Sequence, residues 1–380
     1  MTKNILLINN AYPSPQRPNS GTYVQSIKGR LEEAGFHVDM LVLYSSGTKL
    51  KEKIKDYASF YLKLLSAPLR QYDVLYINHY TLMLPLFIRI PFQKNKIIFH
   101  WHGEELVHNT LFFKAIRSLM KKTLKKNDIH ISPSFYYRSV ITKQLDINPE
   151  RIQISPSGGI DTSLFCPGES KWEKYSLHLG FPSALTKNKG VEYLYQLIQK
   201  VPELQKKLKK DIYIHYIDYG DEDNHWKKAF YKYPIQLIRH VPYPQYLMYK
   251  FYQELDICLM FSKRESLGLV VLEAMACNIP VIARNTTSMP ELVRPGISGE
   301  LISFSPDIDE ILNKIEIISK SLFWISNEAT LFRPGLQFFC SQLLNESWTT
   351  PNLNMIKTWF PTMPYLIRRS WNRFGWHSVQ

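Results

Sequence analysis

The sequence predicts an α/β protein with two doubly wound parallel sheets, and three observations carry this prediction. Short apolar runs alternate with helical patterns, the alternation breaks near residue 160 and restarts, and 380 residues suffice for about two domains of roughly 150 residues each. Strands that alternate with helices imply parallel sheets covered on both faces. The 45% hydrophobic and 21% charged residues fit a globular chain and exclude wholesale disorder.

The first sheet is expected in the N-terminal part of the chain, where apolar runs are bounded by polar or turn residues. After the first run, a helical pattern over residues 22–34 ends at Gly35, a common C-terminal glycine. Basic helical patterns occupy residues 49–69 and 111–126. The expected strands are residues 4–9, 38–44, 73–78, 96–101 and 152–156.

The second sheet is expected beyond a linker near residues 160–175. We expect an N-terminal domain over residues 1–165, a C-terminal domain over residues 166–345, and a poorly periodic tail over residues 346–380. Ligands of such sheets bind at the carboxyl ends of the strands, so the site is expected there, in the cleft between the sheets. The strands of this second sheet are predicted at residues 177–184, 212–217, 235–240, 257–261, 281–283 and 300–302.

The charge of the chain is concentrated in its first part. The formal net charge is +14, and residues 1–150 hold 21 Lys and Arg against 11 Asp and Glu, which leaves +4 for the longer remainder. A basic half of this kind indicates an anionic partner, either nucleic acid, a membrane surface or a phosphorylated substrate.

Cysteine spacing and hydropathy restrict where the protein works. The four cysteines are widely spaced and include no Cys-x-x-Cys pair, which argues against a metal site or a disulfide framework. No run reaches about 18 apolar residues, and the N-terminus enters an apolar strand without the layout of a signal peptide. We therefore expect a reduced, cytoplasmic protein without a transmembrane helix.

One apolar segment carries the clearest sign of chemistry. Between residues 266 and 283 the only charged side chain is Glu273, and a helix over residues 269–277 would be apolar nearly all round and therefore buried. A buried carboxylate costs several kcal/mol unless hydrogen bonds compensate it. The hydroxyls of a ribose would serve as partners, and so would a structural partner from the protein.

The loop before this helix has the features of an anion site. Gly268 stands where the strand over residues 257–261 turns into the helix, and an anion could approach the N–H groups of Leu269 and Val270, where the helix dipole favours negative charge. Glu265 lies in the same loop, eight residues before Glu273. Alone, Gly268 would be interpreted as a turn glycine and Glu265 as a solvated carboxylate. Only their combination with the buried helix and its single carboxylate, Glu273, indicates a ligand site.

The segment from Glu265 to Glu273 resembles the glutamate–seven residues–glutamate signature of retaining glycosyltransferase family 4, the group 1 transferases of GT-B fold. Other segments resemble motifs of the family in the family's order, from about residue 4 to residue 303. They are Ser20-Gly21-Thr22, the histidine-glycine segment over residues 99–103, the linker segment over residues 155–167, Lys189-Gly190-Val191 and the Pro-Glu segment over residues 290–299.

The resemblance implies a donor site in the C-terminal domain. Glu265 would lie against the hydroxyls of the donor sugar as a catalytic residue, and Glu273 would bind the ribose, which favours the ribose over the structural partner. The backbone at Gly268, Leu269 and Val270 would hold the diphosphate, and Lys189 would add a positive charge that stabilises the leaving nucleotide diphosphate.

The resemblance also implies an acceptor site in the N-terminal domain. His102 would lie beside the reacting sugar as a second catalytic residue, with His100 in this role if the register is shifted. Gly21 would let the N-terminal loop reach the phosphate and the acceptor. The family retains the anomeric configuration and uses no bound metal, so we expect no metal ligand and no cofactor beside the nucleotide-diphosphate-sugar.

The expected reaction is transfer of a hexosyl unit to a lipid-linked glycan or polysaccharide in surface polysaccharide synthesis. Three positions depart from the family pattern: Ala184 stands in place of an arginine on the diphosphate, Thr287-Ser288 in place of a glycine pair, and Asn278 where glycine is common. Losing a cation from the diphosphate could cost ~1–3 kcal/mol of donor binding. A weakly active enzyme or a non-catalytic glycosyltransferase-like scaffold therefore stays open as an alternative.

The basic N-terminal helices favour a membrane partner. Residues 111–127 contain six Lys or Arg and no acidic residue, interleaved with apolar side chains, as in helices that lie on an anionic membrane. The simpler interpretation is that the apolar faces of these helices pack on their own sheet and the lysines are solvated, and we expect both to hold, as packed helices whose outer face is basic. A basic nucleic-acid-binding protein is a weaker alternative, because no known nucleic-acid-binding signature is present. We expect peripheral binding to the inner face of the plasma membrane and no nucleic acid partner.

Overall fold

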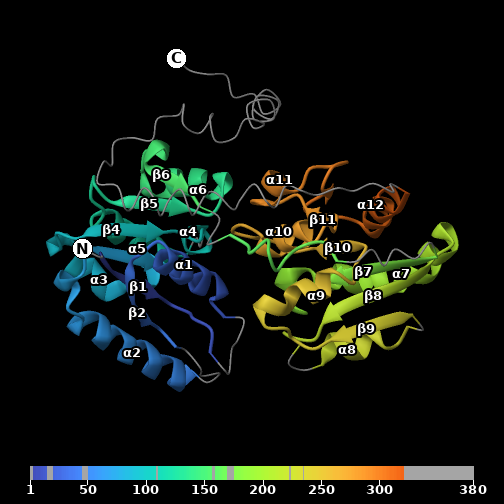
Figure 1. The fold of residues 1–380 in the computed structure, drawn as a ribbon, viewed down its shortest axis with the longest axis horizontal. Coiled ribbons are helices and arrows are strands. Elements are labelled where there is room, and N and C mark those ends of the chain that lie inside the picture. Colours follow the sequence, from blue (N-terminus) through green and yellow to red (C-terminus); the bar gives the residue numbers. More distant parts are fainter. Residues whose placement is uncertain are drawn as a thin grey trace, which may run out of the picture. The chain divides into compact units, whose positions relative to one another are not determined.

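The computed structural model contains two six-stranded parallel sheets with helices between the strands (Figure 1). The predicted tail over residues 346–380, like all residues after 320, lies outside the residues that the structure describes. Among the described residues, no helix is long and apolar enough to cross a membrane. The described residues are 3–14, 20–44, 50–107, 110–155, 159–168, 175–221, 224–233 and 235–320.

The first sheet has the strand order β2-β1-β3-β4-β5-β6. All its pairs are parallel, and β1 lies between β2 and β3, with Leu6 opposite both Asp39 and Leu75. The strands are β1 (Asn4–Asn9), β2 (His37–Val42), β3 (Val74–Asn78), β4 (Lys96–His100), β5 (Ile129–Ser132) and β6 (Ile152–Ile154).

Helices follow the strands of the first sheet as the alternation predicts. Leu6 and Ile8 of β1 belong to a core cluster with residues of α2, α3, α5 and α6, while Ile5 and Leu7, on the other face of the strand, are also fully buried. The helices are α1 (Thr22–Glu33), α2 (Leu50–Ser66), α3 (Leu84–Arg89), α4 (Glu104–Val107), α5 (Leu111–Lys121) and α6 (Phe135–Leu145), with short 3₁₀ turns η1 (Leu69–Gln71), η2 (Tyr80–Leu82), η3 (Ile90–Phe92) and η4 (Pro149–Arg151).

The second sheet has the strand order β12-β11-β10-β7-β8-β9, again with parallel pairs. The strands are β7 (Ser176–Phe181), β8 (Asp211–Ile217), β9 (Gln236–His240), β10 (Ile257–Met260), β11 (Val281–Arg284) and β12 (Gly299–Ile302). The connecting elements are η5 (Lys187–Lys189), α7 (Val191–Leu208), α8 (His225–Phe230), η6 (Gln245–Leu247), α9 (Met248–Tyr252), α10 (Leu269–Ala276), α11 (Met289–Leu292) and α12 (Ile308–Lys320).

Both faces of the second sheet are buried, which explains its near-continuous apolar strands. Leu177, Leu179 and Phe181 of β7 pack in a core cluster with residues of α7 and α12. On the opposite face, Met260 of β10 and Val281 of β11 belong to a second cluster with residues of α9, α10 and α11.

Each sheet has one point where the direction of winding reverses. In the first sheet this point lies between β1 and β3, and in the second sheet it lies between β7 and β10. The loops after these strands diverge to opposite faces, so each reversal leaves room for a ligand at the carboxyl ends. These two edges are where the candidate site residues should be sought.

The predicted α/β class and the two doubly wound sheets are confirmed. The predicted strands all occur, with ends that differ by up to three residues, as for β7, which ends at Phe181 instead of residue 184. The strand β5 was not predicted. It has only four residues, and two of them, His130 and Ser132, are polar although both are buried in the sheet.

Candidate functional site

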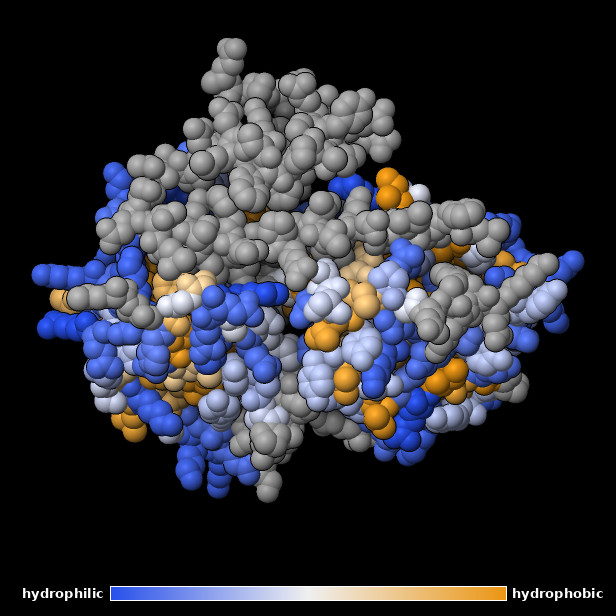
Figure 2. Space-filling model, viewed as in Figure 1, coloured by the Kyte–Doolittle hydropathy of each residue, from blue (hydrophilic) through white to orange (hydrophobic). Residues whose placement is uncertain are grey.

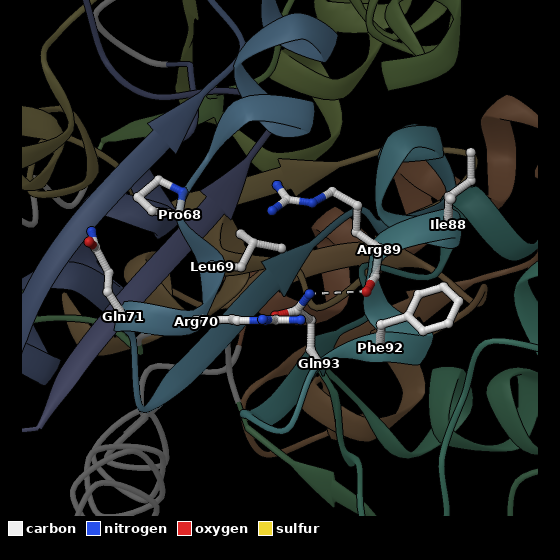
Figure 3. A pocket seen from close by; sticks show the side chains of 8 residues that line it. All are labelled: Pro68, Leu69, Arg70, Gln71, Ile88, Arg89, Phe92 and Gln93. Atoms are coloured by element: carbon white, nitrogen blue, oxygen red, sulfur yellow. Dashed lines mark hydrogen bonds between the residues drawn. The ribbon is translucent and has the colours of Figure 1, made fainter.

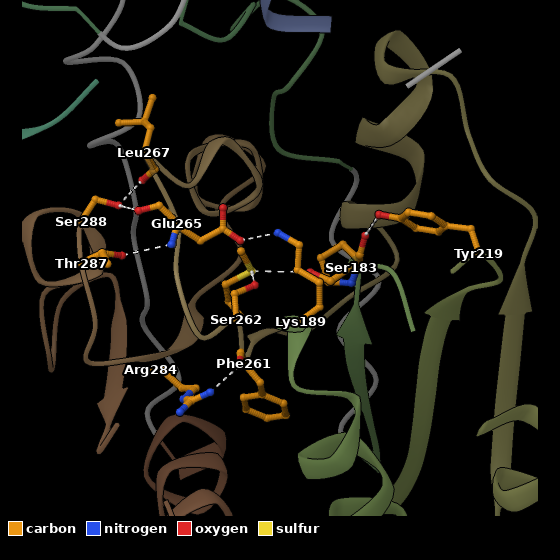
Figure 4. A network of polar contacts seen from close by, with 12 residues as sticks. Ser183, Lys189, Tyr219, Phe261, Ser262, Glu265, Leu267, Arg284, Thr287 and Ser288 are labelled. Atoms are coloured by element: carbon orange, nitrogen blue, oxygen red, sulfur yellow. Dashed lines mark hydrogen bonds and ion pairs between the residues drawn. The ribbon is translucent and has the colours of Figure 1, made fainter. Parts of the chain in front are cut away.

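An ion pair lies at the reversal point of the second sheet. Lys189 follows β7 and Glu265 follows β10, and Lys189 Nζ lies 2.6 Å from Glu265 Oε1 (Figure 4). The Glu265 side chain is 15% exposed, so the carboxylate is accessible but mostly enclosed. Gly190 makes this approach possible, because it has φ +79° and a Cβ there would lie 2.3 Å from the carbonyl oxygen of Phe261. The structure thus brings together two predicted site residues that are 76 positions apart.

The loop that carries Glu265 is held by Thr287 and Ser288, which stand in place of the glycine pair of the family pattern. The N–H of Glu265 donates to Thr287 Oγ1 at 3.1 Å, and Ser288 Oγ lies 3.1 Å from the carbonyl oxygen of Glu265 and 3.0 Å from that of Leu267 (Figure 4). Thr287 has φ 46°, a left-handed conformation that glycine adopts more readily. Thr287 thus adopts a backbone conformation that glycine would adopt without strain, and its side chain forms a hydrogen bond that glycine could not form.

The first turn of α10 has the geometry of an anion site. Gly268 precedes the helix with φ +93°, and a Cβ at this position would lie 2.4 Å from Cε of Met289. The N–H groups of Leu269 and Val270 are the first of the helix, where α-helical geometry provides no partner inside the helix and the dipole attracts negative charge. The glycine, the two N–H groups and the Lys189–Glu265 pair all belong to the carboxyl edge of the second sheet.

Glu273 is buried, as predicted, and the structure gives it two protein partners. Its carboxylate accepts hydrogen bonds from Gln245 Nε2 and from the Tyr252 hydroxyl, the latter at 2.7 Å. Burial raises the pKa of Glu273 to about 7, although both hydrogen bonds act to lower it. A carboxylate has about four acceptor positions, so these two bonds leave room for ribose hydroxyls. The structural alternative is therefore present, and the ribose role stays a prediction.

The predicted residues of the first sheet also lie near its reversal point. His102, after β4, is 7% exposed, and its Nε2 lies 2.8 Å from Asn78 Oδ1 at the end of β3. Its ring stacks between those of His79 and His100, with centroid distances of 4.3 and 4.6 Å. Burial, reinforced by the neighbouring His79 and His100 rings, holds the pKa of His102 well below its usual value, so His102 is uncharged at neutral pH.

Gly21 is required by the backbone at the start of α1. It has φ +71°, and a Cβ there would lie 2.7 Å from the carbonyl carbon of Ala11. Two residues later, the Tyr23 hydroxyl lies 3.0 Å from His79 Nε2, which ties α1 to the stacked histidines. Tyr23 and His79 were not predicted, but His79 directly follows a buried strand, the same signal that points to His102.

The fallback residue His100 is less suited to catalysis than His102. It is 1% exposed, and its Nδ1 lies 3.0 Å from the Tyr76 hydroxyl inside the sheet. Burial lowers the pKa of His100 to about 3. Its place within β4 indicates a structural role beneath His102.

Ala184 lies in the loop after β7, where related enzymes are expected to carry an arginine. A Cβ at Gly220 would lie 2.8 Å from Ala184 Cβ, and the N–H of Leu185 donates to the carbonyl of Tyr219 at 2.8 Å. This small side chain therefore packs closely against the loop after β8. Lys189 is the cation that we predicted for the diphosphate, and the structure places it at this edge of the sheet, beside Glu265.

A surface hollow of the N-terminal part lies apart from these residues (Figure 3). Arg89, one of the lining residues, donates to the carbonyl oxygens of Leu64 and Ala67, and Gln93 Nε2 donates to the carbonyl of Arg89 at 3.2 Å. The predicted site residues are not among those that line it, which are Pro68, Leu69, Arg70, Gln71, Ile88, Arg89, Phe92 and Gln93.

Comparison with known proteins agrees with this geometry. Residues 169–322 match the family model described as glycosyl transferases group 1, a range that contains Lys189, Glu265, Gly268 and Glu273. An uncharacterized 41.2 kDa protein in the cps region of Klebsiella pneumoniae is 26% identical over 245 residues. The aligned segment covers 62% of this chain and 64% of that protein, which is less than two thirds of the relative's length.

Solved structures show the same fold. Anabaena HepE, in complex with UDP and glucose, superposes with a TM-score of 0.63 at 17% identity, over 97% of this chain and 100% of that one. Sucrose-phosphate synthase from Thermosynechococcus elongatus gives a TM-score of 0.67 at 17% identity, over 98% and 100%. Residues 169–322 are therefore similar to the group 1 glycosyltransferases, and the chain has a GT-B fold.

Proposed function

We propose that the protein is a group 1 glycosyltransferase that moves a hexosyl unit from a nucleotide-diphosphate sugar to a lipid-linked glycan or polysaccharide, with retention of anomeric configuration and without a metal or cofactor. One observation carries the proposal. The Lys189–Glu265 pair lies beside the N-terminus of α10 at the reversal point of the second sheet, the place where parallel sheets bind nucleotides. The solved relative bound to UDP and glucose supports a nucleotide-sugar donor.

In this proposal the donor reorganises the ion pair. The diphosphate binds the N–H groups of Leu269 and Val270, and Lys189 turns from Glu265 to the phosphate oxygens. Glu265 is then free to accept hydrogen bonds from hydroxyls of the sugar, and Glu273 accepts those of the ribose. Cation and amide dipoles stabilise the negative charge that grows on the leaving phosphate as the glycosidic bond breaks.

The acceptor is proposed to enter from the side of His102 and Gly21. The bond from the sugar carbon to the acceptor oxygen forms on the face from which the phosphate leaves, and the phosphate takes the acceptor's proton. No side chain is needed as a covalent nucleophile. An uncharged His102, fixed by Asn78, can position an acceptor hydroxyl by hydrogen bonding without adding charge to the site.

Surface polysaccharide is the proposed product class, and the inner face of the plasma membrane the proposed location. The relative encoded in a cps region supports the first point. The membrane location is supported by α5, where Leu111 is 85% exposed and Phe112 is 64% exposed at the start of the basic segment. Ile88 and Phe92 are 71% and 74% exposed, and Lys125 Nζ donates to the carbonyl of Gln93, directly after Phe92.

Exposed apolar side chains beside lysines form the kind of surface that binds anionic lipid, where each Lys or Arg adds about 1 kcal/mol. On the face shown in Figure 2, hydrophobic groups gather in small patches between hydrophilic ones. Co-sedimentation should show binding to vesicles with phosphatidylserine and none to neutral phosphatidylcholine vesicles. Equal recovery in the supernatant with both would contradict the membrane proposal.

The alternative is a scaffold that no longer transfers sugar. Ala184 favours this alternative, because the diphosphate would lack one expected cation. A turnover assay decides between the two. The wild type should release nucleoside diphosphate from at least one of UDP-, GDP- and dTDP-hexoses.

Glu265→Gln should lower this turnover by about 100-fold or more, because a contact to the reacting sugar is lost. Glu203→Gln, at an exposed position on α7, is the matched control and should retain wild-type turnover. Unchanged turnover in Glu265→Gln would contradict the proposed reaction. Absence of turnover in the wild type with every donor would also contradict it and would favour the non-catalytic scaffold.

A further inference from the structure

Three histidines on adjacent strands of the second sheet form a continuous hydrogen-bonded row. His178 of β7 reaches His215 of β8 through Nδ1 and Nε2 at 2.9 Å, and His215 Nδ1 lies 3.0 Å from Nε2 of His240, the last residue of β9. His215 and His240 are 1% and 7% exposed. Nothing in the proposed sugar transfer uses these residues.

A carboxylate completes this group. Glu254 follows α9, and its Oε2 lies 3.8 Å from His215 Nδ1 and 3.8 Å from His240 Nε2. With the 3.0 Å between the two nitrogens, these distances define a triangle. A point about 2.1 Å from all three atoms exists in the plane of this triangle, and zinc bonds to histidine nitrogen and carboxylate oxygen have about this length. Tetrahedral coordination places the ion out of this plane, so binding requires the two nitrogens to move slightly apart and the carboxylate oxygen to move slightly closer.

We propose that His215, His240 and Glu254 bind a divalent transition-metal ion, for which Zn²⁺ is the best fit. Two imidazole nitrogens and one carboxylate oxygen are a donor set that zinc accepts in tetrahedral sites with a water molecule as the fourth ligand. The Glu254 side chain is 39% exposed, so the ion and its water have a path from solvent.

Outer partners hold both rings in the orientation that a metal requires. The outer nitrogen of His215, Nε2, faces His178, and that of His240, Nδ1, lies 3.3 Å from the Tyr243 hydroxyl. Histidine ligands usually donate their second N–H to such a partner, which fixes the tautomer. With the ion bound, each ring keeps its single proton on the outer nitrogen, and the ion replaces the hydrogen bond between the facing nitrogens.

The ion would be structural and would act at a distance from the sugar. His240 and Glu254 stand at the two ends of the segment that supplies Gln245 and Tyr252, the partners of Glu273. The Phe251 ring also packs on the rings of His215 and His240, with centroid distances of 6.5 and 5.0 Å. Joining the ends of this segment would fix α9 and thereby the surroundings of Glu273.

Metal binding to the full-length protein tests this site. After treatment with a chelator, the wild type should take up one Zn²⁺ per chain in equilibrium dialysis, and Co²⁺ in its place should give the visible absorption of a four-coordinate site. Glu254→Gln and His240→Gln should each weaken Zn²⁺ binding at least tenfold. His225→Gln, an exposed histidine at the start of α8, is the control and should bind like the wild type.

Glu254 is partly exposed, so its variant is expected to fold even where loss of a buried histidine disturbs the sheet. Circular dichroism without metal confirms the fold of each variant. Wild type that binds less than one Zn²⁺ per chain overturns the proposal, and so does a Glu254→Gln variant that binds as tightly as the wild type. These readouts do not depend on glycosyl transfer, so they stand apart from the test of the proposed function.

Discussion

The two sheets wind in the same way but carry different charges at their reversal points. The edge of the second sheet holds an ion pair, Lys189 with Glu265, and the buried carboxylate of Glu273. The edge of the first sheet holds Asn78 and the stacked rings of His79, His100 and His102, and burial lowers the pKa of His100 and of His102 so that these two rings are uncharged at neutral pH. Topology therefore decides where a ligand can bind, whereas the residues after each strand decide which chemistry it must have.

The largest expected effect concerns the glycines beside these two edges. At Gly103, next to His102, a Cβ would lie 1.9 Å from the ring of Tyr137, which is fully buried and cannot move away. At Gly268 the one close contact of the Cβ would be with the flexible end of Met289, at 2.4 Å, while Leu292 lies at an ordinary 3.5 Å. Gly103→Ala should lower the free energy of unfolding in urea by about 3–5 kcal/mol, and Gly268→Ala by about 1–2 kcal/mol.

Gly29, within α1, provides the control for this pair, because a Cβ there meets nothing within 4 Å. Gly29→Ala should leave stability unchanged or raise it by up to about 1 kcal/mol. If Gly103→Ala and Gly268→Ala lowered the free energy of unfolding equally, the predicted difference in packing between the two edges would be wrong.

The second prediction is that the two edges respond to pH in opposite directions. Burial raises the pKa of Glu273 to about 7, so its favourable contribution is present below about pH 4.5 and is lost as the pH rises through 7, a change of about 3 kcal/mol. Burial lowers the pKa of His100 to about 3, so its contribution is present above about pH 6.5 and is lost as the pH falls, by about 2 kcal/mol at pH 5.

Urea unfolding of single variants at pH 5 and pH 7.5 separates the two responses. Relative to the wild type, Glu273→Gln should become more stable as the pH rises, and His100→Phe should become more stable as the pH falls. Parallel changes in both variants would contradict the assigned protonation states. Glu310→Gln, on the exposed side of α12, corrects for a general effect of losing a carboxylate.

The smallest effects are expected where the Glu265 loop is fastened. Ser288→Ala removes a hydroxyl that contacts two carbonyl oxygens and should cost about 1–2 kcal/mol of stability. Thr287→Gly loses a hydrogen bond to Glu265 but relieves a left-handed backbone, so its net effect should stay within about 0.5 kcal/mol. A loss for Thr287→Gly that equals that of Ser288→Ala would show that backbone strain plays no part.

The arrangement of the fold could be predicted because it depends on local patterns. Apolar runs and helical periodicity placed the strands, and Gly268 was identified from its position between a strand and a helix, whereas Gly21 was identified from the family resemblance. The strand β5 was missed because its four residues include His130 and Ser132, whose burial depends on neighbouring strands. No local pattern distinguishes such a segment from a loop.

The partners of the site residues could not be predicted, because they come from distant parts of the chain. Glu273 meets Gln245 and Tyr252, which lie 28 and 21 residues away and carry no motif. The row of His178, His215 and His240 likewise forms only when three strands pair. A sequence can show that a buried carboxylate needs partners, but pairing of the strands decides which residues provide them.

Binding of nucleoside diphosphates, measured by titration calorimetry, tests the central claim most directly. UDP, GDP and ADP are titrated into the wild type, and the tightest ligand is then titrated into Lys189→Met and His102→Asn, with Lys206→Met as a control in the last turn of α7. Lys189→Met should weaken binding by about 10–100-fold, because one charged contact to the diphosphate is lost, while the other two variants bind like the wild type. Unchanged binding to Lys189→Met, or an equal loss in His102→Asn, would contradict a nucleotide site at the charged edge of the second sheet.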